Sequence, residues 1–482
     1  MSELKEIGIT TRKEVDFSEW YTQVVTKTGL IDYSPVKGFI VLKPYGYRIW
    51  EIIKESLDKK LKESGHENGF LPILIPESLL SKEKDHFEGF TPEVFWVTKA
   101  GNTDLLEKLA VRPTSETLAY HIFSQWIMSY RDLPLKINFW NSALRAEIKS
   151  TKPFIRNSEF LWQEGHTVHE HQKEAEEEVL LILNYYQYII ENFLAIPTVQ
   201  GIKTEREKFV GALYTNALES LMPDGKALQM ATSHNLGQNF SKPFEIRFLG
   251  RDSKQYFAWQ TSWGISWRVI GAMIMIHGDN KGLILPPKIA PTQLVIVPIF
   301  KKQERAIVIE ESKKLFVELE NLDFRVILDD REEYTAGWKF HDWEVKGVPL
   351  RINIGIRDIN NNNLEIVRRD TGEKILIKRV DCIKSVHFYL DQIQKSLFEK
   401  AKNIQNNNII KISNYEEMKK ILNEKGGFIL ADWCEKEECE NSIKNETGAD
   451  IRLIPLEKYA SDNKCIYCNE CSKQTVIFAK AY

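Results

Sequence analysis

The sequence predicts an α+β protein with a mainly antiparallel sheet, followed by a compact α/β domain and a small cysteine-bearing third unit. Up to about residue 290, amphipathic helices mix with apolar strands, and two long strand-like runs face each other within residues 137–169. Beyond residue 291, strands alternate with helices, which is typical of an α/β domain. The 482 residues suit three domains of about 150 residues each.

Within the first domain, residues 1–290, the apolar spacing predicts a helix over residues 47–63 and strands over residues 70–75 and 245–249. Pro286, Pro287 and Pro291 then interrupt the pattern, because proline has no backbone donor and resists both helix and central strand. We therefore expect a domain boundary after residue 290.

The second domain, residues 291–402, shows regular alternation of strands and helices. The predicted strands cover residues 294–298, 324–328 and 349–354, and the predicted helices cover residues 303–319 and 335–346. Further strands and a helix extend to about residue 400. Residues 404–408 are polar and predict a linker, after which the third unit continues to residue 482.

Charge and hydropathy narrow the classes of function. The formal net charge is -3, so any contact with nucleic acid must be local rather than a bulk electrostatic effect. The longest apolar runs, such as residues 294–300, are far shorter than the roughly 20 residues of a membrane helix. The first residues have no signal-peptide core, so we expect a cytoplasmic protein without a membrane partner.

Two arginines lie on either side of a predicted turn, an arrangement that can bind a nucleotide phosphate. The chain has neither a Gly-x-x-x-x-Gly-Lys-Ser/Thr loop nor a Gly-x-Gly-x-x-Gly loop after a strand, so side chains must hold any phosphate. Arg145 and Arg156 suit this task, since guanidinium groups stay charged and bind phosphate oxygens in pairs. Glu147 would share a strand face with Arg145. The alternative is that both arginines are surface charges paired with Glu147 and Glu159.

Residues 145–166 resemble motif 2 of class II aminoacyl-tRNA synthetases, with Arg-x-Glu on one strand, a second arginine in the loop, and a return strand. Other segments resemble the prolyl branch of this class, in its archaeal and eukaryotic-like form. These segments are residues 16–21 (DFSEWY), 111–117 (VRPTSET), 229–242 (QMATSHNLGQNFSK), 263–268 (WGISWR), 337–349 and 478–482 (FAKAY). They occur in order and span almost the whole chain.

The resemblance implies a class II catalytic domain over residues 1–290, an anticodon-binding domain over 291–402 and a zinc-binding domain over 403–482. It also implies ATP-dependent attachment of L-proline to tRNA(Pro) in two steps through prolyl-adenylate. Two other functions stay open: another class IIa synthetase, for threonine, serine, glycine or histidine, and a synthetase-like regulatory protein that binds tRNA. The regulatory protein would lack at least one phosphate-binding arginine.

Site residues follow from the same resemblance. It implies proline contacts at Thr114, Glu116, Arg145 and His234. It implies ATP contacts at Arg145, Glu147, Arg156, Asn157, Gln229, Thr232, Ser266 and Arg268, of which Arg145 and Arg268 are the catalytic phosphate-binding groups. Mg2+ is expected with ATP, near Glu147 and Gln229. The alternative for Thr114 and Glu116 is an ordinary helix start, where both would satisfy backbone amides, and a lone histidine is usually structural.

The second domain is expected to contact anticodon bases through Lys339, Glu344, Lys346, Arg351 and Arg357. Trp338, Phe340 and Trp343 could stack on bases, or they could belong to the core of the domain. The chain departs from the family pattern at residues 355–358, where Gly-Ile-Arg-Asp replaces the usual Gly-Pro-Arg-Asp.

Five of the six cysteines fall between residues 434 and 471, which indicates a local metal site rather than a disulfide framework. Cys434 and Cys439 form one close pair. The second pair is either Cys465 with Cys468 or Cys468 with Cys471, and the resemblance favours Cys465 with Cys468. Two such pairs suit a structural zinc ion; the alternative is a group of free buried thiols.

Two further expectations concern assembly and proofreading. Residues 70–76 resemble motif 1, which lies at a subunit interface in this class, so a homodimer is implied. Only about 70 residues separate Arg156 from Gln229, too few for the editing insertion of bacterial-type relatives. We therefore expect no hydrolysis of mischarged alanine within this chain.

Overall fold

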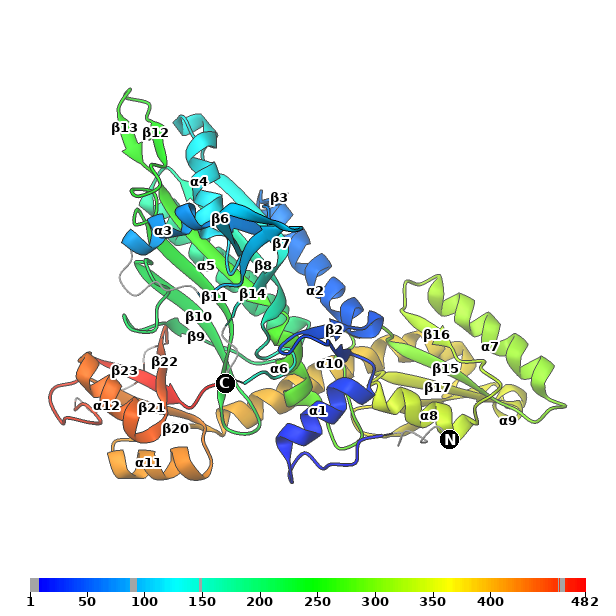
Figure 1. Ribbon diagram of the computed structural model, residues 1–482. Helices are drawn as coiled ribbons and strands as arrows, with labels where there is room; N and C mark the ends of the chain where they lie inside the picture. The colour runs from blue at the N-terminus through cyan, green and yellow to red at the C-terminus, as the bar shows by residue number, and fades with distance from the viewer. Residues whose placement is uncertain (1–7, 87–92, 147–149, 458, 460–463) are drawn as a thin grey trace.

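A computed structural model describes residues 8–86, 93–146, 150–457, 459 and 464–482 (Figure 1). Its largest element is an eleven-stranded sheet with the strand order β20-β21-β23-β22-β9-β10-β11-β14-β8-β7-β3. In chain order these strands are β3 (Glu67–Gly69), β7 (Leu135–Leu144), β8 (Glu159–His169), β9 (Val199–Ile202), β10 (Tyr214–Leu221), β11 (Ala227–Gly237), β14 (Trp259–Ser266), β20 (Ile409–Lys411), β21 (Phe428–Trp433), β22 (Asp450–Pro455) and β23 (Gln474–Ala479).

The centre of this sheet is antiparallel, which confirms the predicted α+β class. Strands β7 and β8 pair in register from Leu135 with Val168 to Leu144 with Glu159, so residues 145–158 form the loop between them. β14 pairs with β8 and with β11 in the same antiparallel sense. Only the edge pairs β3 with β7 and β20 with β21 are parallel. The predicted facing strands within residues 137–169 are therefore confirmed.

Six helices accompany the sheet in the described part of the first 290 residues. They are α1 (Phe17–Lys27), α2 (Pro44–Glu63), α3 (Glu77–His86), α4 (Glu116–Trp126), α5 (Gln172–Asn192) and α6 (Arg268–His277). α5 packs on β11 and β14. Small sheets and turns complete the region: β1 (Ile31–Tyr33) with β2 (Ile40–Leu42), β4 (Leu74–Pro76) with β6 (Thr103–Val111) and β5 (Trp96–Ala100), β12 (Arg247–Leu249) with β13 (Gln255–Phe257), and a short helical turn at Tyr130–Asp132.

Two predicted strands in this region were wrong in extent. Residues 70–75 do not form one strand, because β3 ends at Gly69 and β4 begins at Leu74, with Pro72 between them and Phe70 85% exposed. Proline cannot donate to a ladder, which explains the interruption. The strand predicted over residues 245–249 begins at Arg247, since Glu245 has φ of +55° and cannot be extended.

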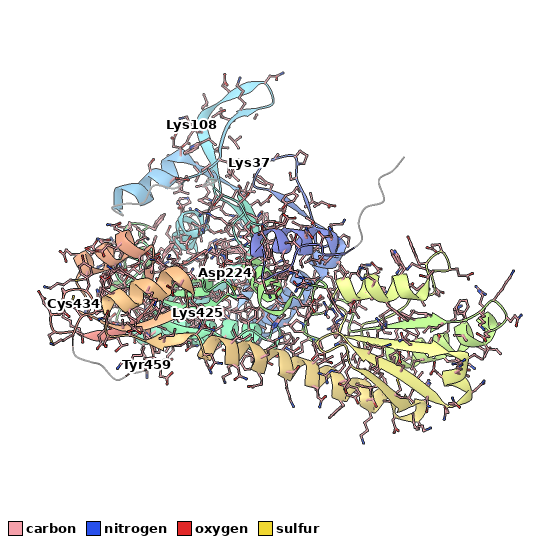
Figure 2. The ribbon with its side chains drawn as sticks, turned by 90° about the horizontal axis from the view of Figure 1, so that it is seen from below. Lys37, Lys108, Asp224, Lys425, Cys434 and Tyr459 are labelled. Carbon is pink, nitrogen blue, oxygen red and sulfur yellow. The ribbon has the colours of Figure 1, made fainter. Side chains whose placement is uncertain are left out.

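Residues 291–402 contain a five-stranded sheet with the order β16-β15-β17-β18-β19. Its elements are β15 (Leu294–Ile299), α7 (Arg305–Glu320), β16 (Val326–Leu328), α8 (Ala336–Val345), β17 (Leu350–Gly355), α9 (Ile356–Asn360), β18 (Asn363–Arg368), β19 (Lys374–Lys378), a helical turn at Arg379–Asp381 and α10 (Cys382–Asn406). β15 is parallel to β16 and β17, as expected for strands joined by α7 and α8. Figure 2 shows this unit projecting away from the rest of the chain.

The polar linker predicted over residues 404–408 was wrong, because α10 continues to Asn406. Gln405 is buried, and its side-chain oxygen accepts a hydrogen bond from the Leu221 backbone amide at 3.1 Å. The polar residues at the end of α10 therefore make contacts with the large sheet, and their polarity does not indicate a loop.

The last unit, which includes α11 (Tyr415–Glu424) and α12 (Glu437–Thr447), extends the large sheet instead of standing apart. β22 pairs with β9, matching Ile454 with Ile202 and Pro455 with Gly201. The approach requires glycine, because a Cβ at residue 201 would lie 2.5 Å from the Ile454 carbonyl oxygen. Among the described residues, no helix is long and apolar enough to span a membrane.

Candidate active site

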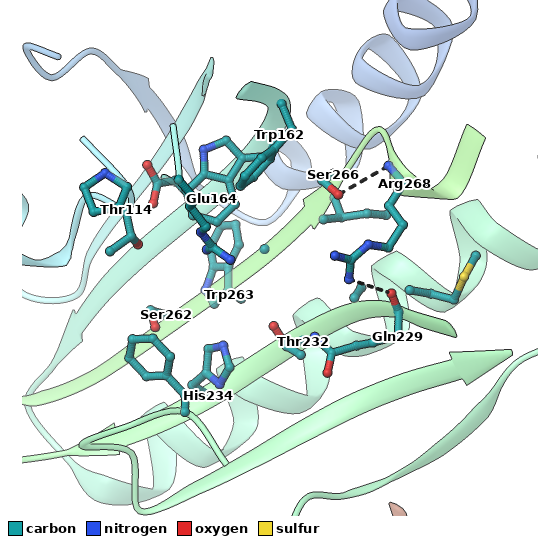
Figure 3. A pocket seen from close by; sticks show the side chains of 18 of the residues that line it. Thr114, Trp162, Glu164, Gln229, Thr232, His234, Ser262, Trp263, Ser266 and Arg268 are labelled. Carbon is teal, nitrogen blue, oxygen red and sulfur yellow. Dashed lines mark hydrogen bonds between the residues drawn. The ribbon is translucent and has the colours of Figure 1, made fainter. Parts of the chain in front are cut away.

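A cavity of about 590 Å³ opens on the large sheet, over β8, β11 and β14 (Figure 3). The residues predicted to bind proline and ATP come together here. Those that line the cavity are Thr114, Glu116, Arg145, Arg156, Asn157, Gln229, Thr232, His234, Ser266 and Arg268. Glu147, also predicted to contact ATP, lies outside the described residues. Figure 3 places Thr114 and Glu164 at one side of the cavity and Arg268 at the other.

Arg268 is the first residue of α6 and is fixed by three hydrogen bonds. Its backbone amide donates to Ser266 Oγ at 3.3 Å, and its guanidinium donates to the Ile155 carbonyl at 3.2 Å and the Gln229 carbonyl at 3.4 Å. Burial, and next the charge of Arg145, lower the pKa of Arg268 to about 10. The group therefore stays protonated at neutral pH while repelling a second cation, which is the electrostatic setting of an anion site.

The loop between β7 and β8 carries the other arginines and is anchored in the core. Phe154 and Ile155 are buried, and the Phe154 ring meets the Trp267 ring edge-on at 5.6 Å. The Arg145 amide donates to the Ser158 carbonyl at 2.7 Å, which closes the base of the loop. The charge of Arg156 also lowers the pKa of Arg268, after larger contributions. The apolar anchor thus holds Arg145 and Arg156 at the end of the cavity where Arg268 lies.

Asn157 follows Arg156 in the same loop. Its side-chain oxygen is buried and has no hydrogen-bond partner among the described residues. A buried polar atom without a partner costs about 1–3 kcal/mol, so a bound ligand with a donor would relieve that cost.

The opposite end of the cavity is acidic. The Thr114 hydroxyl donates to the Glu116 carboxylate, and the Ser115 hydroxyl and amide both donate to the Glu164 carboxylate. His166 Nε2 lies 3.4 Å from Glu164 Oε2. Ligand atoms of Glu116, Glu164 and His166 all lie within 4.8 Å of one another.

The pKa values of these buried groups shift in different directions. Burial, together with the neighbouring charge of Glu164, raises the pKa of Glu116. The pKa of Glu164 is lowered, because its hydrogen bond to His166 and the charge of that ring outweigh burial. The same hydrogen bond raises the pKa of His166 against the effect of burial. A cationic ligand would stabilise the ionised form of Glu116, which the protein alone disfavours.

His234 is a neutral histidine within the cavity wall. Burial, and next the charge of His166, lower the pKa of His234 to about 3. Its Nδ1 lies 2.9 Å from the Thr215 hydroxyl, and its ring centroid lies 4.7 Å from that of Phe209. The ring therefore offers an uncharged polar edge beside an aromatic wall.

Trp162, Glu164, His166 and Phe209 also line the cavity and were missing from the predicted set. The first three alternate along β8, and the period of two places them on one face. That signal was visible in the sequence, because the three residues occupy every second position of a predicted strand. His169 lies three residues beyond His166 on the same strand. The two histidines contact different groups: His169 Nε2 lies 2.7 Å from the Thr167 hydroxyl.

The residues predicted to contact the anticodon lie near α8 and α9, with different exposure. Lys339 is buried, and its ammonium donates to the Asp329 carbonyl at 3.0 Å, which argues against a contact with RNA. Glu344 and Lys346 are half-buried, Arg357 is exposed at the start of α9, and the Arg351 guanidinium lies 3.9 Å from the Phe340 ring centroid. Trp343 is buried and donates to Asp329, which supports its alternative role in the core.

The thiols of Cys434, Cys439, Cys465 and Cys468 gather within 4.8 Å of one another. The Cys434 sulfur lies 3.6 Å from that of Cys439 and 3.7 Å from that of Cys468. Tetrahedral zinc with Zn–S bonds of about 2.3 Å separates its sulfurs by about 3.8 Å, so the cluster fits this ion. Cys471 is exposed, and its thiol donates to the Ser472 carbonyl.

An antiparallel sheet that carries a motif 2 hairpin, with an arginine at the start of the helix after β14, defines a class II aminoacyl-tRNA synthetase. Family models agree: the tRNA synthetase class II core domain (G, H, P, S and T) matches residues 95–277, the anticodon binding domain matches residues 293–387, and the C-terminal domain of prolyl-tRNA synthetase matches residues 415–482. The chain belongs to the proline--tRNA ligase family.

Relatives of known name cover the full chain. A proline--tRNA ligase of Cenarchaeum symbiosum is 54% identical over 99% of this chain and 100% of its own length, and one of Natranaerobius thermophilus is 52% identical over 99% and 98%. The crystal structure of prolyl-tRNA synthetase from Cryptosporidium parvum, in complex with halofuginone and AMPPNP, superposes with a TM-score of 0.94 at 44% identity, covering 99% of this chain and 100% of that one. The predicted resemblance is confirmed.

Proposed function

We propose that this enzyme joins L-proline to tRNA(Pro) in two steps. Proline and ATP first give prolyl-adenylate and pyrophosphate, and the 3′-terminal ribose hydroxyl of the tRNA then attacks the mixed anhydride. The observation that carries the proposal is the polarity of the cavity, which has three guanidinium groups at one end and the Glu116–Glu164 pair at the other. The AMPPNP of the Cryptosporidium parvum complex supports a nucleotide in the corresponding cavity.

We propose a separate task for each end of the cavity. Arg145, Arg156 and Arg268 would bind the triphosphate and expose its α-phosphorus to the proline carboxylate, which is itself the nucleophile. Positioning and charge neutralisation then supply the rate without a protein nucleophile. Gln229, Thr232, Ser266 and Asn157 would hold the nucleotide by neutral hydrogen bonds, and we keep Glu147 as a predicted ATP contact.

Mg2+ would suit the nucleotide end of the cavity, because Gln229 lines it and carries a side-chain amide oxygen, and Mg2+ prefers oxygen ligands. The ion would be held by Gln229 and the substrate phosphates, with Glu147 as a further predicted contact. When bound, it neutralises phosphate charge.

At the acidic end, Thr114 and Glu116 would accept hydrogen bonds from the secondary ammonium of proline, with His234 beside the ring. Replacing Glu116 with glutamine should raise the KM for proline at least tenfold, since a hydrogen bond to a charged group contributes about 1.5–3 kcal/mol. Proline-dependent exchange of pyrophosphate into ATP measures this directly. The exposed Glu205 provides a control, as Glu205→Gln should leave the KM unchanged.

The same exchange assay tests the proposal as a whole. Wild-type enzyme with ATP and Mg2+ should support exchange with proline but not with threonine, serine, glycine or histidine. Exchange with one of those amino acids in place of proline would assign the chain to another substrate. No exchange with any amino acid would favour a regulatory tRNA-binding role.

We propose structural zinc at Cys434, Cys439, Cys465 and Cys468, which would fix the turns after β21 and before β23. Native mass spectrometry should find one zinc per chain in wild type, none or very little in Cys465→Ser, and full occupancy in Cys471→Ser. The comparison of the last two variants separates the two possible second pairs. Zinc retained by Cys465→Ser and lost by Cys471→Ser would exclude this ligand set.

For tRNA, we propose that Glu344, Lys346, Arg351 and Arg357 contact splayed anticodon bases, and that Lys339 supports α8 from inside.

We further propose the domain limits 1–290, 291–402 and 403–482. The pairing of β9 with β22 then joins the first domain to the third. A homodimer is supported by the exposed apolar side chains of Phe70 and Ile73 in the predicted interface segment. The cytoplasm stays the expected compartment.

A further inference from the structure

Residues 279–285, just after α6, run alongside residues 344–347, at the end of α8. We call these two segments, together with Arg369, the joint. The Leu283 amide donates to the Val345 carbonyl at 3.0 Å, and the Leu285 amide donates to the Gly347 carbonyl at 3.2 Å. A Cβ at Gly347, whose φ is +74°, would lie 2.6 Å from Leu283, so side chains larger than glycine would separate the two backbones. Backbone hydrogen bonds and close packing therefore hold the two segments together.

An ion pair fastens the joint. The Arg369 guanidinium donates to both carboxylate oxygens of Asp279, at 2.9 and 2.6 Å, and its Nε donates to the Glu344 carbonyl at 2.8 Å. The Arg369 side chain is only 4% exposed. A two-fold hydrogen bond of this kind fixes orientation as well as distance. Arg369 thus ties the sheet of the second unit to the chain that leaves α6.

The joint follows directly on the helix that begins in the active-site cavity. α6 begins at Arg268 in the cavity and ends at His277, two residues before Asp279. At about 1.5 Å per residue this helix spans about 15 Å. The Lys13 ammonium donates to the carbonyls of Met275 and Gly278, at 2.6 and 2.7 Å, and so fixes its last turn. A shift at Asp279 would reach Arg268 through one buried helix.

The other side of the joint carries predicted anticodon contacts. Glu344 accepts a hydrogen bond from the Lys281 ammonium at 2.8 Å, and the Lys346 carbonyl accepts one from the Tyr45 hydroxyl at 3.1 Å. A base that donates to the Glu344 carboxylate would compete with Lys281. Anticodon binding would then change a contact of the segment that continues from α6.

We infer that Asp279 and Arg369 are a positioning pair that makes aminoacylation depend on the anticodon, by transmitting its occupancy through the joint and α6 to Arg268. The inference rests on the proposed anticodon contacts. A ligand shifts an equilibrium only by contacts that differ between two states, and the Lys281–Glu344 pair is such a contact.

The test uses full-length enzyme and two tRNA(Pro) transcripts, one with its own anticodon and one with the anticodon changed. The ratio of their aminoacylation kcat values measures discrimination. Asp279→Asn and Arg369→Gln should each lower this ratio about tenfold, within the usual range of coupling between sites. Exchange of pyrophosphate without tRNA should stay within about twofold of wild type. The double variant should be no worse than Arg369→Gln alone, because both substitutions break the same ion pair.

Arg368→Gln is the matched control. Arg368 precedes Arg369, is similarly buried, and pairs with Asp370 inside its own unit at 3.1 and 2.8 Å. It should keep the wild-type ratio. If Arg369→Gln does not fold, Arg369→Lys serves instead, since it keeps the charge and loses the paired geometry.

Three results would overturn the inference, each in a recognisable way. If the wild-type enzyme discriminates between the two transcripts and the variants show the same kcat ratio, the joint does not transmit anticodon occupancy to the active site. Loss of exchange in proportion to loss of aminoacylation, or a lowered ratio in Arg368→Gln, would indicate a merely structural role. A wild-type enzyme indifferent to the anticodon would instead refute the proposed anticodon contacts, and the inference with them.

Discussion

Replacing Arg145 with alanine is expected to lower proline-dependent pyrophosphate exchange by about 100- to 1000-fold, the usual loss when one preorganised charge-stabilising donor is removed. The guanidinium sits at the end of β7, where it faces the arginine of α6 closely enough to lower the pKa of Arg268. Under the proposed mechanism, this guanidinium contacts both the α-phosphate and the proline carboxylate as they join. The loss should appear mainly in kcat, because the guanidinium stabilises the charge that develops in the transition state more than it stabilises the bound substrates.

Folding should be little affected, since Arg145 is exposed and its loop is anchored by the buried Phe154 and Ile155. The melting temperature and tRNA affinity of Arg145→Ala should therefore stay near those of wild type. Arg131, an exposed arginine at the short turn before β7, provides a control whose alanine variant should keep full exchange. Exchange that persists in Arg145→Ala would remove this residue from the adenylation step.

The local patterns in the sequence predicted the parts of the fold that local forces decide. Alternating apolar residues predicted the facing strands β7 and β8, and strand–helix alternation predicted the sheet of the second unit. The pairing of β22 with β9 was not predictable, because it joins residues 201–202 to residues 454–455 and depends on a glycine that permits close approach. Gln405 was mistaken for part of a linker because its partner, the Leu221 backbone amide, is also distant in the sequence.

The residues of the candidate site also fall into those that local patterns predicted and those that they did not. The presence of Arg145 and Arg156 in one cavity was predictable from their position around a turn, and that of Arg268 from the resemblance. Glu164 was not assigned, because its role depends on α4 bringing Ser115 and Glu116 to the face of β8. Lys339 was predicted to contact RNA because it lies in the expected anticodon-binding domain, but its side chain is buried and donates to the Asp329 carbonyl.

Replacing Glu219 with glutamine is expected to destabilise the protein by about 3–5 kcal/mol, the usual cost of breaking a buried ion pair by removing one partner. Glu219 lies on β10 and is fully buried. Its Oε1 accepts hydrogen bonds from the Lys203 ammonium at 2.6 Å and from the Arg452 guanidinium at 2.7 Å. Because Arg452 belongs to β22, the substitution would leave two buried cations facing each other across the seam between the catalytic sheet and the last unit.

Thermal unfolding by calorimetry measures this effect, with Glu435→Gln as a control that removes a partly exposed pair with Lys473 and should cost at most about 1 kcal/mol. The dependence on pH gives a second measurement. The cations hold the pKa of Glu219 below its usual range although burial opposes them. Its stabilisation is therefore complete above the ordinary glutamate pKa of about 4.3 and is lost as the pH falls toward the lower folded value.

Glu219→Gln should lack that part of the acid dependence, so its stability curve should approach that of wild type at low pH. A variant with apolar residues at all three positions, Lys203→Met with Glu219→Leu and Arg452→Leu, should recover much of the lost stability, because no uncompensated charge remains buried. Equal melting temperatures for wild type and Glu219→Gln would mean that the ion cluster does not stabilise the seam. A triple variant no more stable than the single one would mean that shape, rather than charge, holds β22 against β9.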